Sequence, residues 1–191
     1  MSPVVFSEDS ARLELIPDFV ENDLFEHLLA NVPWQQNHIR IFGKTIAEPR
    51  LTAWFGPPYS YSGLQWPETP MPEILRQLSS EITALAGFSF NSCLLNYYRN
   101  GQDSMGWHRD NEPEMDQRCI ASISVGDSRD FLYRKGTSGP SQALTLTGGS
   151  LLLMFDFQKD FYHAIPKRKN IDNGRINLTF RHIKTLSHVS E

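Results

Sequence analysis

The sequence predicts a mainly β domain with flanking helices, of the sandwich or jelly-roll type. Two short helical patterns come first, and from about residue 88 the chain becomes a run of short strands separated by Gly, Asn, Asp and Pro turns. Many short strands with few helices are typical of sandwiches and jelly rolls. The length of 191 residues suits one domain with a real core, so we expect a single domain over residues 1–191.

Two amphipathic helices are predicted in the first half of the chain. Residues 20–31 repeat apolar side chains at a spacing of four. Residues 71–86 carry Pro72 near the start and Gly87 at the end. The apolar face of this second helix is expected to consist of Ile74, Leu75, Leu78, Ile82 and Leu85. The segment between the helices, residues 33–70, is rich in Pro, Gly and aromatic residues and predicts a long irregular region with about two short strands, which is often functional in compact domains.

The second half of the chain predicts a series of strands that pack against the two helices. Apolar runs mark the strands, and turn sequences such as Gly126-Asp127 and Gly148-Gly149 separate them. The strands are expected at residues 90–98, 119–125, 129–134, 142–147, 150–155, 161–165 and 175–183.

Composition and charge exclude several classes of protein. No apolar run approaches the ~20 residues that span a bilayer, and the first ten residues do not form a secretory signal. Two cysteines fit a reducing compartment and exclude both a disulfide scaffold and a cysteine-based zinc site. We therefore expect an intracellular protein (cytoplasmic if bacterial, nuclear if eukaryotic) that is a monomer without a membrane partner.

The net charge of −4 at first argues against a nucleic-acid partner. The charge is unevenly distributed, however. Residues 1–31 carry seven acids and one base, whereas residues 159–184 carry seven bases and two acids. A local basic surface therefore remains open, beside the alternative that both segments are ordinary solvated faces.

His108 and Asp110 stand two residues apart and form half of a candidate metal site. Alternate side chains of an extended chain point to the same side, so both could reach one ion. His163, within the apolar run 161–166, is the natural third ligand. A polar pair at a strand end and a hydrogen-bonded core histidine are the alternatives. Two histidines and one carboxylate suit non-heme iron(II) oxygen chemistry, although zinc could occupy the same ligands.

The strand at residues 175–181 carries a polar face that favours iron over zinc. Period two places Ile176, Leu178 and Phe180 on the buried face. The other face collects Arg175, Asn177, Thr179 and Arg181. Inside a barrel, such a face could bind a dicarboxylate through bidentate arginine pairs, whereas on the outside it would be a solvated arginine face. Asn96 and Tyr98 alternate onto one face of another strand and could contribute to the same ligand.

Four sequence blocks together carry a family resemblance. They are Asn96-Tyr97-Tyr98-Arg99-Asn100-Gly101, His108-Arg109-Asp110-Asn111-Glu112, His163, and Arg175-Ile176-Asn177-Leu178-Thr179-Phe180-Arg181. In order and spacing the chain resembles the AlkB family of iron(II) and 2-oxoglutarate dioxygenases, in particular its DNA alkylation-repair branch. The similarity runs from about residue 40 to residue 183. It implies a double-stranded β-helix, which is a jelly roll, and Fe(II), 2-oxoglutarate and O2 as cofactor and cosubstrates.

The resemblance also implies roles for single residues. His108, Asp110 and His163 would be the iron ligands and the catalytic centre. In the cosubstrate pocket, Arg175 would pair with the distal carboxylate of 2-oxoglutarate, with help from Asn96 and Tyr98. Arg181 and Asn177 would contact the carboxylate nearer the metal. Thr179 would line the pocket.

On the substrate side, residues of about 36–66 resemble the nucleotide-recognition lid of the repair branch. Phe42 matches a finger residue that fills the gap left by a flipped base, and Glu112 matches a carboxylate that contacts the alkylated base. Other expected substrate contacts are Arg50, Tyr59, Tyr61 and Ser62. Arg129, Arg134, Lys135, Lys167, Arg168 and Lys169 could contact phosphates.

The activity implied is oxidative demethylation of N1-methyladenine and N3-methylcytosine in single- or double-stranded DNA, with release of formaldehyde. Three alternatives stay open. A dioxygenase of the same family could act on RNA or another substrate, a non-catalytic jelly roll could bind a dicarboxylate, and a zinc hydrolase could use the same ligands. The last gives no role to the arginine strand.

Overall fold

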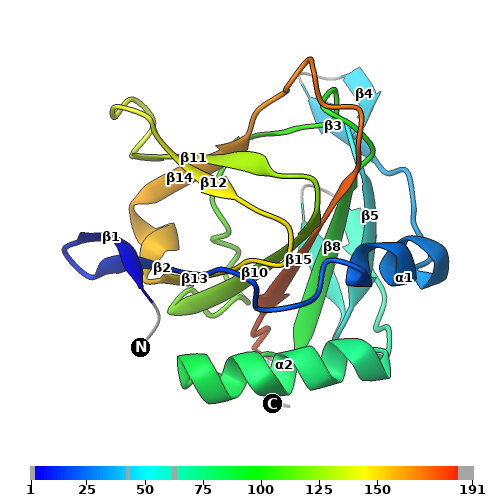
Figure 1. The fold of residues 1–191 in the computed structure, drawn as a ribbon, viewed down its shortest axis with the longest axis horizontal. Coiled ribbons are helices and arrows are strands. Elements are labelled where there is room, and N and C mark those ends of the chain that lie inside the picture. The colour runs from blue at the N-terminus through cyan, green and yellow to red at the C-terminus, as the bar shows by residue number, and fades with distance from the viewer. Residues whose placement is uncertain (1–2, 42–43, 62–63, 185–191) are drawn as a thin grey trace, which may run out of the picture.

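The computed structural model, which describes residues 3–41, 44–61 and 64–184, contains two facing β-sheets (Figure 1). The larger sheet has seven strands in the order β1-β2-β13-β10-β15-β8-β5, and the smaller has four in the order β12-β11-β14-β9. Two separate hairpins, β3-β4 and β6-β7, lie in the segment between the helices. The predicted mainly β jelly roll with flanking helices is confirmed.

The elements have the following bounds: β1 Val4–Glu8, β2 Ala11–Ile16, α1 Leu24–Asn31, β3 His38–Ile41, β4 Lys44–Ala47, β5 Leu51–Phe55, β6 Tyr59–Tyr61, β7 Leu64–Trp66, α2 Glu73–Ala86, β8 Ser92–Tyr98, β9 Met105–His108, β10 Cys119–Gly126, β11 Arg129–Lys135, β12 Gln142–Leu146, β13 Leu151–Phe155, a 3-10 turn Phe157–Lys159, β14 Phe161–Ile165 and β15 Arg175–Arg181.

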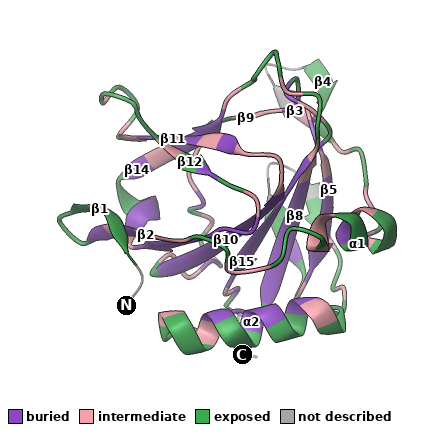
Figure 2. Ribbon diagram, in the orientation of Figure 1, coloured by how far each residue is buried: buried purple, intermediate pink, exposed green. Residues whose placement is uncertain are grey.

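Both predicted helices are present and pack on the larger sheet. Leu28 of α1 and Leu75 and Ile82 of α2 join one apolar core with sheet residues such as Ile123 and Leu178, and the buried side of α2 faces the sheet in Figure 2. α1 begins at Leu24 rather than at residue 20, because the residues before it form turn bonds between residues three apart, such as those from the Leu24 N–H to Glu21 O and from the Phe25 N–H to Asn22 O. α2 ends at Gly87, whose φ of 71° is a left-handed conformation that glycine adopts without strain.

The helix α2 differs from its predicted apolar face at one position. Leu85 is 54% exposed, whereas Leu75 and Ile82 are fully buried. The apolar pattern in the sequence therefore extends beyond the part of the helix face that contacts the sheet.

All seven predicted strands are present within two residues of the expected bounds. The segment at residues 33–70 is less irregular than predicted, since it contains β3 to β7. The pattern also missed β1, β2 and the four-residue β9. In β9 the pairing with β14 shifts register, since His163 pairs with His108 but Ile165 pairs with Met105. This bulge interrupts the alternation that marks a strand in sequence.

The space between the two sheets has an apolar end and a polar end. Ile120, Leu152 and Phe131 belong to a second core that closes the apolar end. The polar end is reached by β15 and β10, which pair in the centre of the larger sheet, and by β9 and β14 of the smaller one. Both faces of β15 are therefore buried, one under the helices and one toward the smaller sheet.

No helix among the described residues is both long and apolar enough to cross a bilayer.

Candidate metal and cosubstrate site

The structure brings His108, Asp110 and His163 together between the sheets. His108 and His163 are cross-strand partners in β9 and β14, with ring centroids 4.2 Å apart. Asp110 follows β9, and its Oδ1 lies 3.9 Å from His108 Nε2. One ligand atom from each residue lies within 4.8 Å of the others. This is the geometry of a three-ligand site for one metal ion.

The protonation states of this triad suit metal binding. His108 Nδ1 donates to Gly106 O at 2.8 Å, which leaves Nε2 with its lone pair free. Burial lowers the pKa of His108, and burial with the nearby His108 ring lowers the pKa of His163 to about 3. Burial acts to raise the pKa of Asp110, but the Arg181 guanidinium and both histidines outweigh it and lower that pKa. The site therefore presents two neutral imidazoles and one carboxylate.

Unsatisfied atoms show that these residues fit a cation. Among the residues that the structure describes, Asp110 Oδ1 and His163 Nδ1 are buried without a hydrogen-bond partner. A buried acceptor without a partner costs free energy unless an ion or donor meets it. The other carboxylate oxygen, Asp110 Oδ2, accepts from Arg181 Nη2 at 2.9 Å, and the Asp110 backbone N–H donates to Gln158 Oε1 at 3.0 Å. These two contacts fix the carboxylate and direct Oδ1 toward the imidazoles.

A narrow polar cavity extends from the triad along β15. It is lined by all six residues that the sequence predicted for cosubstrate binding, Asn96, Tyr98, Arg175, Asn177, Thr179 and Arg181, and by the triad itself. Apolar side chains, among them Phe131, Leu146 and Ile165, close the opposite wall. The cavity, of about 30 Å³, therefore excludes bulk water, and its polar lining is suited to a small polar ligand beside a metal.

Arg175 is a buried cation at one end of this cavity. It is 1% exposed, and Nη2 donates to Ser124 Oγ at 2.7 Å. Nε and Nη1 are buried without an acceptor among the described residues. Its guanidinium lies 5.4 Å from the Tyr98 ring centroid, and burial lowers its pKa to about 10. The free donors and the uncompensated charge are suited to a carboxylate.

The rest of the polar face of β15 is already organised by hydrogen bonds. Thr179 Oγ1 donates to Asn177 Oδ1 at 2.9 Å, and Asn177 Nδ2 donates to Ser122 Oγ at 2.6 Å. Ser122 and Ser124 were missed by the sequence reasoning. Their signal was available, because they alternate along the otherwise apolar strand β10 and therefore face the same side.

Arg181 lies between the triad and the predicted substrate side. Besides pairing with Asp110, it places Nη1 3.5 Å from the Tyr59 hydroxyl. Burial raises the pKa of Tyr59, and burial together with the Asp110 charge raises the pKa of Glu112. Tyr59 also stacks on Trp54 with ring centroids 4.6 Å apart. The expected substrate residues Tyr59 and Glu112 thus lie beside the triad.

The remaining predicted substrate residues are placed differently. Arg50 is buried, pairs with Glu48 at 2.8 Å, and donates from Nε to Asn96 Oδ1 at 2.8 Å. It therefore supports the cosubstrate cavity, and its contact with substrate stays a prediction. Phe42 and Ser62 lie outside the described residues, and for Tyr61 only the backbone, in β6, is described.

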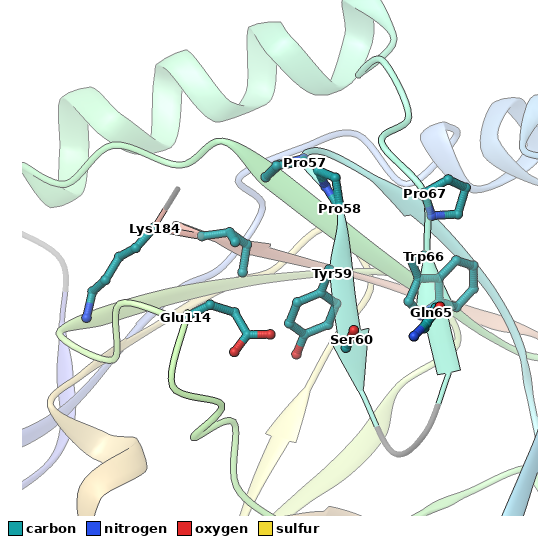
Figure 3. A pocket seen from close by; sticks show the side chains of 10 residues that line it. Pro57, Pro58, Tyr59, Ser60, Gln65, Trp66, Pro67, Glu114 and Lys184 are labelled. Carbon is teal, nitrogen blue, oxygen red and sulfur yellow. The ribbon is translucent and has the colours of Figure 1, made fainter. Parts of the chain in front are cut away.

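A wider groove of about 640 Å³ lies on the outer side of Tyr59 (Figure 3). Trp66 and Gln65 of β7 flank Tyr59 and Ser60 on one side, and Glu114 and Lys184 flank them on the other (Figure 3). The hairpin β6-β7 thus forms one wall of this groove.

Comparison with protein families identifies the superfamily to which the chain belongs. A model described as the 2OG-Fe(II) oxygenase superfamily matches residues 13–181. The chain belongs to this superfamily. The 2OG-Fe(II) oxygenases use iron(II), 2-oxoglutarate and dioxygen, so the predicted cofactor and cosubstrates are confirmed.

Curated relatives place the chain in the AlkB family of these oxygenases. It is 39% identical to "Alpha-ketoglutarate-dependent dioxygenase alkB homolog 3" of Bos taurus, covering 95% of this chain and 68% of the relative. The Homo sapiens protein of the same name is 38% identical, with 90% and 66% covered. "DNA oxidative demethylase ALKBH2" of Arabidopsis thaliana is 36% identical, with 82% and 60% covered. The chain thus spans about two thirds or less of these relatives' lengths.

A solved structure supports the fold independently. "The structure of OsALKBH1" superposes with a TM-score of 0.65 over 93% of this chain and 100% of that chain, at 15% sequence identity. The AlkB-family resemblance and the assignment as an iron(II)/2-oxoglutarate dioxygenase are confirmed. The roles of individual site residues stay predictions, supported by the geometry above.

Proposed function

We propose that the chain is an oxidative demethylase that repairs N-alkylated bases in DNA, with N1-methyladenine and N3-methylcytosine as substrates. The observation that carries this proposal is the joint presence of the buried triad and the arginine-lined cavity in a chain whose relatives include proteins named DNA oxidative demethylase. We further propose that the chain acts as an intracellular monomer.

The chain's own residues would bind and orient the reactants. His108 and His163 would hold iron(II) through ring nitrogens, and Asp110 through Oδ1. Arg175 would receive the distal carboxylate of 2-oxoglutarate, because its free donors and charge lie at the end of the cavity away from the triad. Arg181 and Asn177 would contact the carboxylate nearer the metal. This assignment leaves the position above the triad, beside Tyr59 and Glu112, for the methylated base.

When bound, iron(II), 2-oxoglutarate and dioxygen supply the oxidation: one oxygen atom enters an N-methyl C–H bond, the other leaves in succinate with loss of carbon dioxide, and the hydroxymethyl group departs as formaldehyde. The protein contributes geometry and exclusion of water. Arg181 holds Asp110 in one orientation, and the wall formed by Phe131, Leu146 and Ile165 keeps bulk water from the cavity. The Glu112 carboxylate is suited to a methylated base that carries positive charge.

Formaldehyde release from oligonucleotides with one defined lesion tests the proposal. Release is expected from DNA that carries N1-methyladenine or N3-methylcytosine, and it should stop when iron or 2-oxoglutarate is withheld. Single-stranded DNA, duplex DNA and RNA of the same sequence form the substrate arms. His108→Ala should abolish release, whereas His27→Ala, an exposed histidine on α1, should leave it unchanged. Release from RNA alone, or from no nucleic acid, would contradict the proposal.

A further inference from the structure

The outer face of the smaller sheet carries a cluster that the site described above does not use. It consists of Trp107, Arg109, Arg134 and Tyr162, which we call the outer arginine patch. The bulge in β9 turns Met105 and His108 toward the cavity and Trp107 away from it. Trp107 is 36% exposed and is the single aromatic residue among the exposed large hydrophobic side chains of the described residues.

Each arginine of the patch lies over an aromatic ring. The Arg134 guanidinium is 4.1 Å from the Trp107 ring centroid, and that of Arg109 is 5.1 Å from the Tyr162 ring centroid. Arg134 and Tyr162 are cross-strand partners in β11 and β14, so the two pairs are contiguous. A guanidinium that lies on a ring is held in place while its N–H edge stays free for an anion.

Neither arginine has an acidic partner among the residues that the structure describes. Arg109 Nη1 donates to Lys159 O at 2.7 Å, and Arg134 Nε is buried without an acceptor in the described part of the chain. A buried donor without a partner points to a missing ligand or water. Two adjacent positive charges that no carboxylate neutralises form a site for anionic groups.

Other basic residues that the sequence offered for phosphate contact are occupied elsewhere. Arg129 is 2% exposed and donates to the carbonyls of residues 100, 103 and 166, so the expectation of a phosphate contact is wrong for it. Lys135 is paired with Glu8 and Asp9, and Arg168 with Asp130. The outer arginine patch is therefore better placed for a polyanion than these three residues are.

The patch also lies along the edge strand that carries one of the predicted metal ligands, His108. β9 is an edge strand of the smaller sheet, and the residue just before it contacts the predicted lid, because the Ser104 N–H donates to Pro49 O at 3.0 Å. Trp107 and Arg109 directly flank His108 in the sequence. A strand that delivers a base to the triad past the lid would pass this edge.

We propose that the outer arginine patch binds the phosphate backbone of the DNA strand that flanks the target nucleotide. This inference rests on the proposed function, because it takes DNA as the substrate. Phosphate contacts position a nucleic acid without reading its sequence. The patch would therefore increase affinity for longer substrates, whatever base is demethylated.

The salt dependence of DNA binding tests this proposal. A fluorescent single-stranded oligonucleotide with one N1-methyladenine is titrated with the iron-loaded protein under nitrogen, at salt concentrations between 50 and 200 mM. For Arg134→Gln, the slope of log Kd against log salt should fall by about 0.7, with about fivefold to tenfold weaker binding at the lowest salt. Arg109→Gln together with Arg134→Gln should lower the slope by about 1.4.

Two variants separate charge from structure. Arg134→Lys keeps the charge and should keep most of the slope, even if binding weakens through loss of the ring contact. Arg118→Gln is the matched control, because Arg118 also lies over a ring, that of Phe88, but is paired with Asp116. It should leave the slope unchanged. Melting temperatures are measured for every variant, and Arg109→Gln alone decides the test if the Arg134 variants do not fold.

The outcomes distinguish failure of the patch proposal from failure of the proposed function. Formaldehyde release by wild type from the methylated oligonucleotide tests the demethylase activity alone. If wild type releases formaldehyde but the Arg134→Gln and Arg109→Gln slopes equal that of wild type, the patch proposal is overturned and the function stands. A slope change with RNA but not with DNA would also overturn it.

Discussion

Arg175 carries a buried positive charge that the folded chain alone does not neutralise. It is 1% exposed, its Nε and Nη1 have no acceptor in the described residues, and burial lowers its pKa to about 10. A buried charge without a counterion is costly, and its replacement by an apolar side chain of similar volume can be stabilising. The cosubstrate carboxylate would compensate this charge only when bound.

We expect Arg175→Met to increase the free energy of unfolding of the cosubstrate-free protein by about 1–4 kcal/mol, measured by urea denaturation. In wild type, added 2-oxoglutarate with iron should raise the melting temperature, and in the variant it should not. Arg129→Met is the matched control. It should destabilise the protein, because three backbone carbonyls lose their donor. A destabilised Arg175→Met would contradict the account of an uncompensated charge.

At the residue scale, much of the site followed from the sequence, and the rest depended on contacts between strands. Period two correctly placed Arg175, Asn177, Thr179 and Arg181 on one face, and the family resemblance indicated which histidine joins His108. The partners of these residues could not be predicted, because they depend on register. Ser124 reaches Arg175 only because β10 and β15 pair as they do, and Arg50 reaches Asn96 across 46 residues of sequence.

At the scale of elements, α2 shows how far an apolar pattern describes real packing. Ile82 is fully buried against the larger sheet, whereas Leu85, three residues later in the same pattern, is 54% exposed. Periodicity identifies a helix face, but the extent of the surface beneath it is set by the tertiary fold.

We expect Ile82→Ala to lower the free energy of unfolding by about 2–5 kcal/mol, because it leaves a cavity under α2. Leu85→Ala, the same loss of side-chain volume on the same helix, should change it by less than about 0.5 kcal/mol. Urea denaturation of both variants beside wild type measures the difference. Equal losses for the two variants would show that Leu85 is buried in solution, contrary to the structure.

The short strand β9 marks the limit of pattern-based prediction at this scale. It has four residues and a bulge, so neither its length nor its alternation identified it. The strand is nevertheless central to the site, because the bulge allows Met105 and His108, three residues apart, both to face the cavity. Elements that depart from regular geometry next to a site carry little local signal, since cross-strand pairing rather than propensity holds them.

At the scale of the whole molecule, the two cysteines report on the integrity of the larger sheet. Cys93 in β8 and Cys119 in β10 are 0% and 3% exposed and belong to the core beneath the helices. Burial raises the pKa of both thiols, that of Cys119 to about 12. Because the thiolate is the reactive form, native thiols at neutral pH should be both inaccessible and protonated.

We therefore expect a thiol reagent at pH 8 to label both cysteines only as fast as the protein opens. The two labelling rates should be similar and should rise with urea, and mass spectrometry of quenched samples measures them. In fully denatured protein, both cysteines should be labelled at the rate of free cysteine. Rapid labelling of either residue in the absence of denaturant would contradict the buried core.

The polar cavity has a consequence for attempts to engineer this protein. Its buried cation, its unsatisfied Asp110 oxygen and its free imidazole nitrogen are each the kind of defect that stabilising substitutions remove. A directed-evolution campaign selected on heat resistance alone would accordingly be drawn first to these positions and would enrich well-folded, inactive variants. Thermal stability and catalytic activity make opposite demands on these few side chains, so a successful selection must measure both in every round.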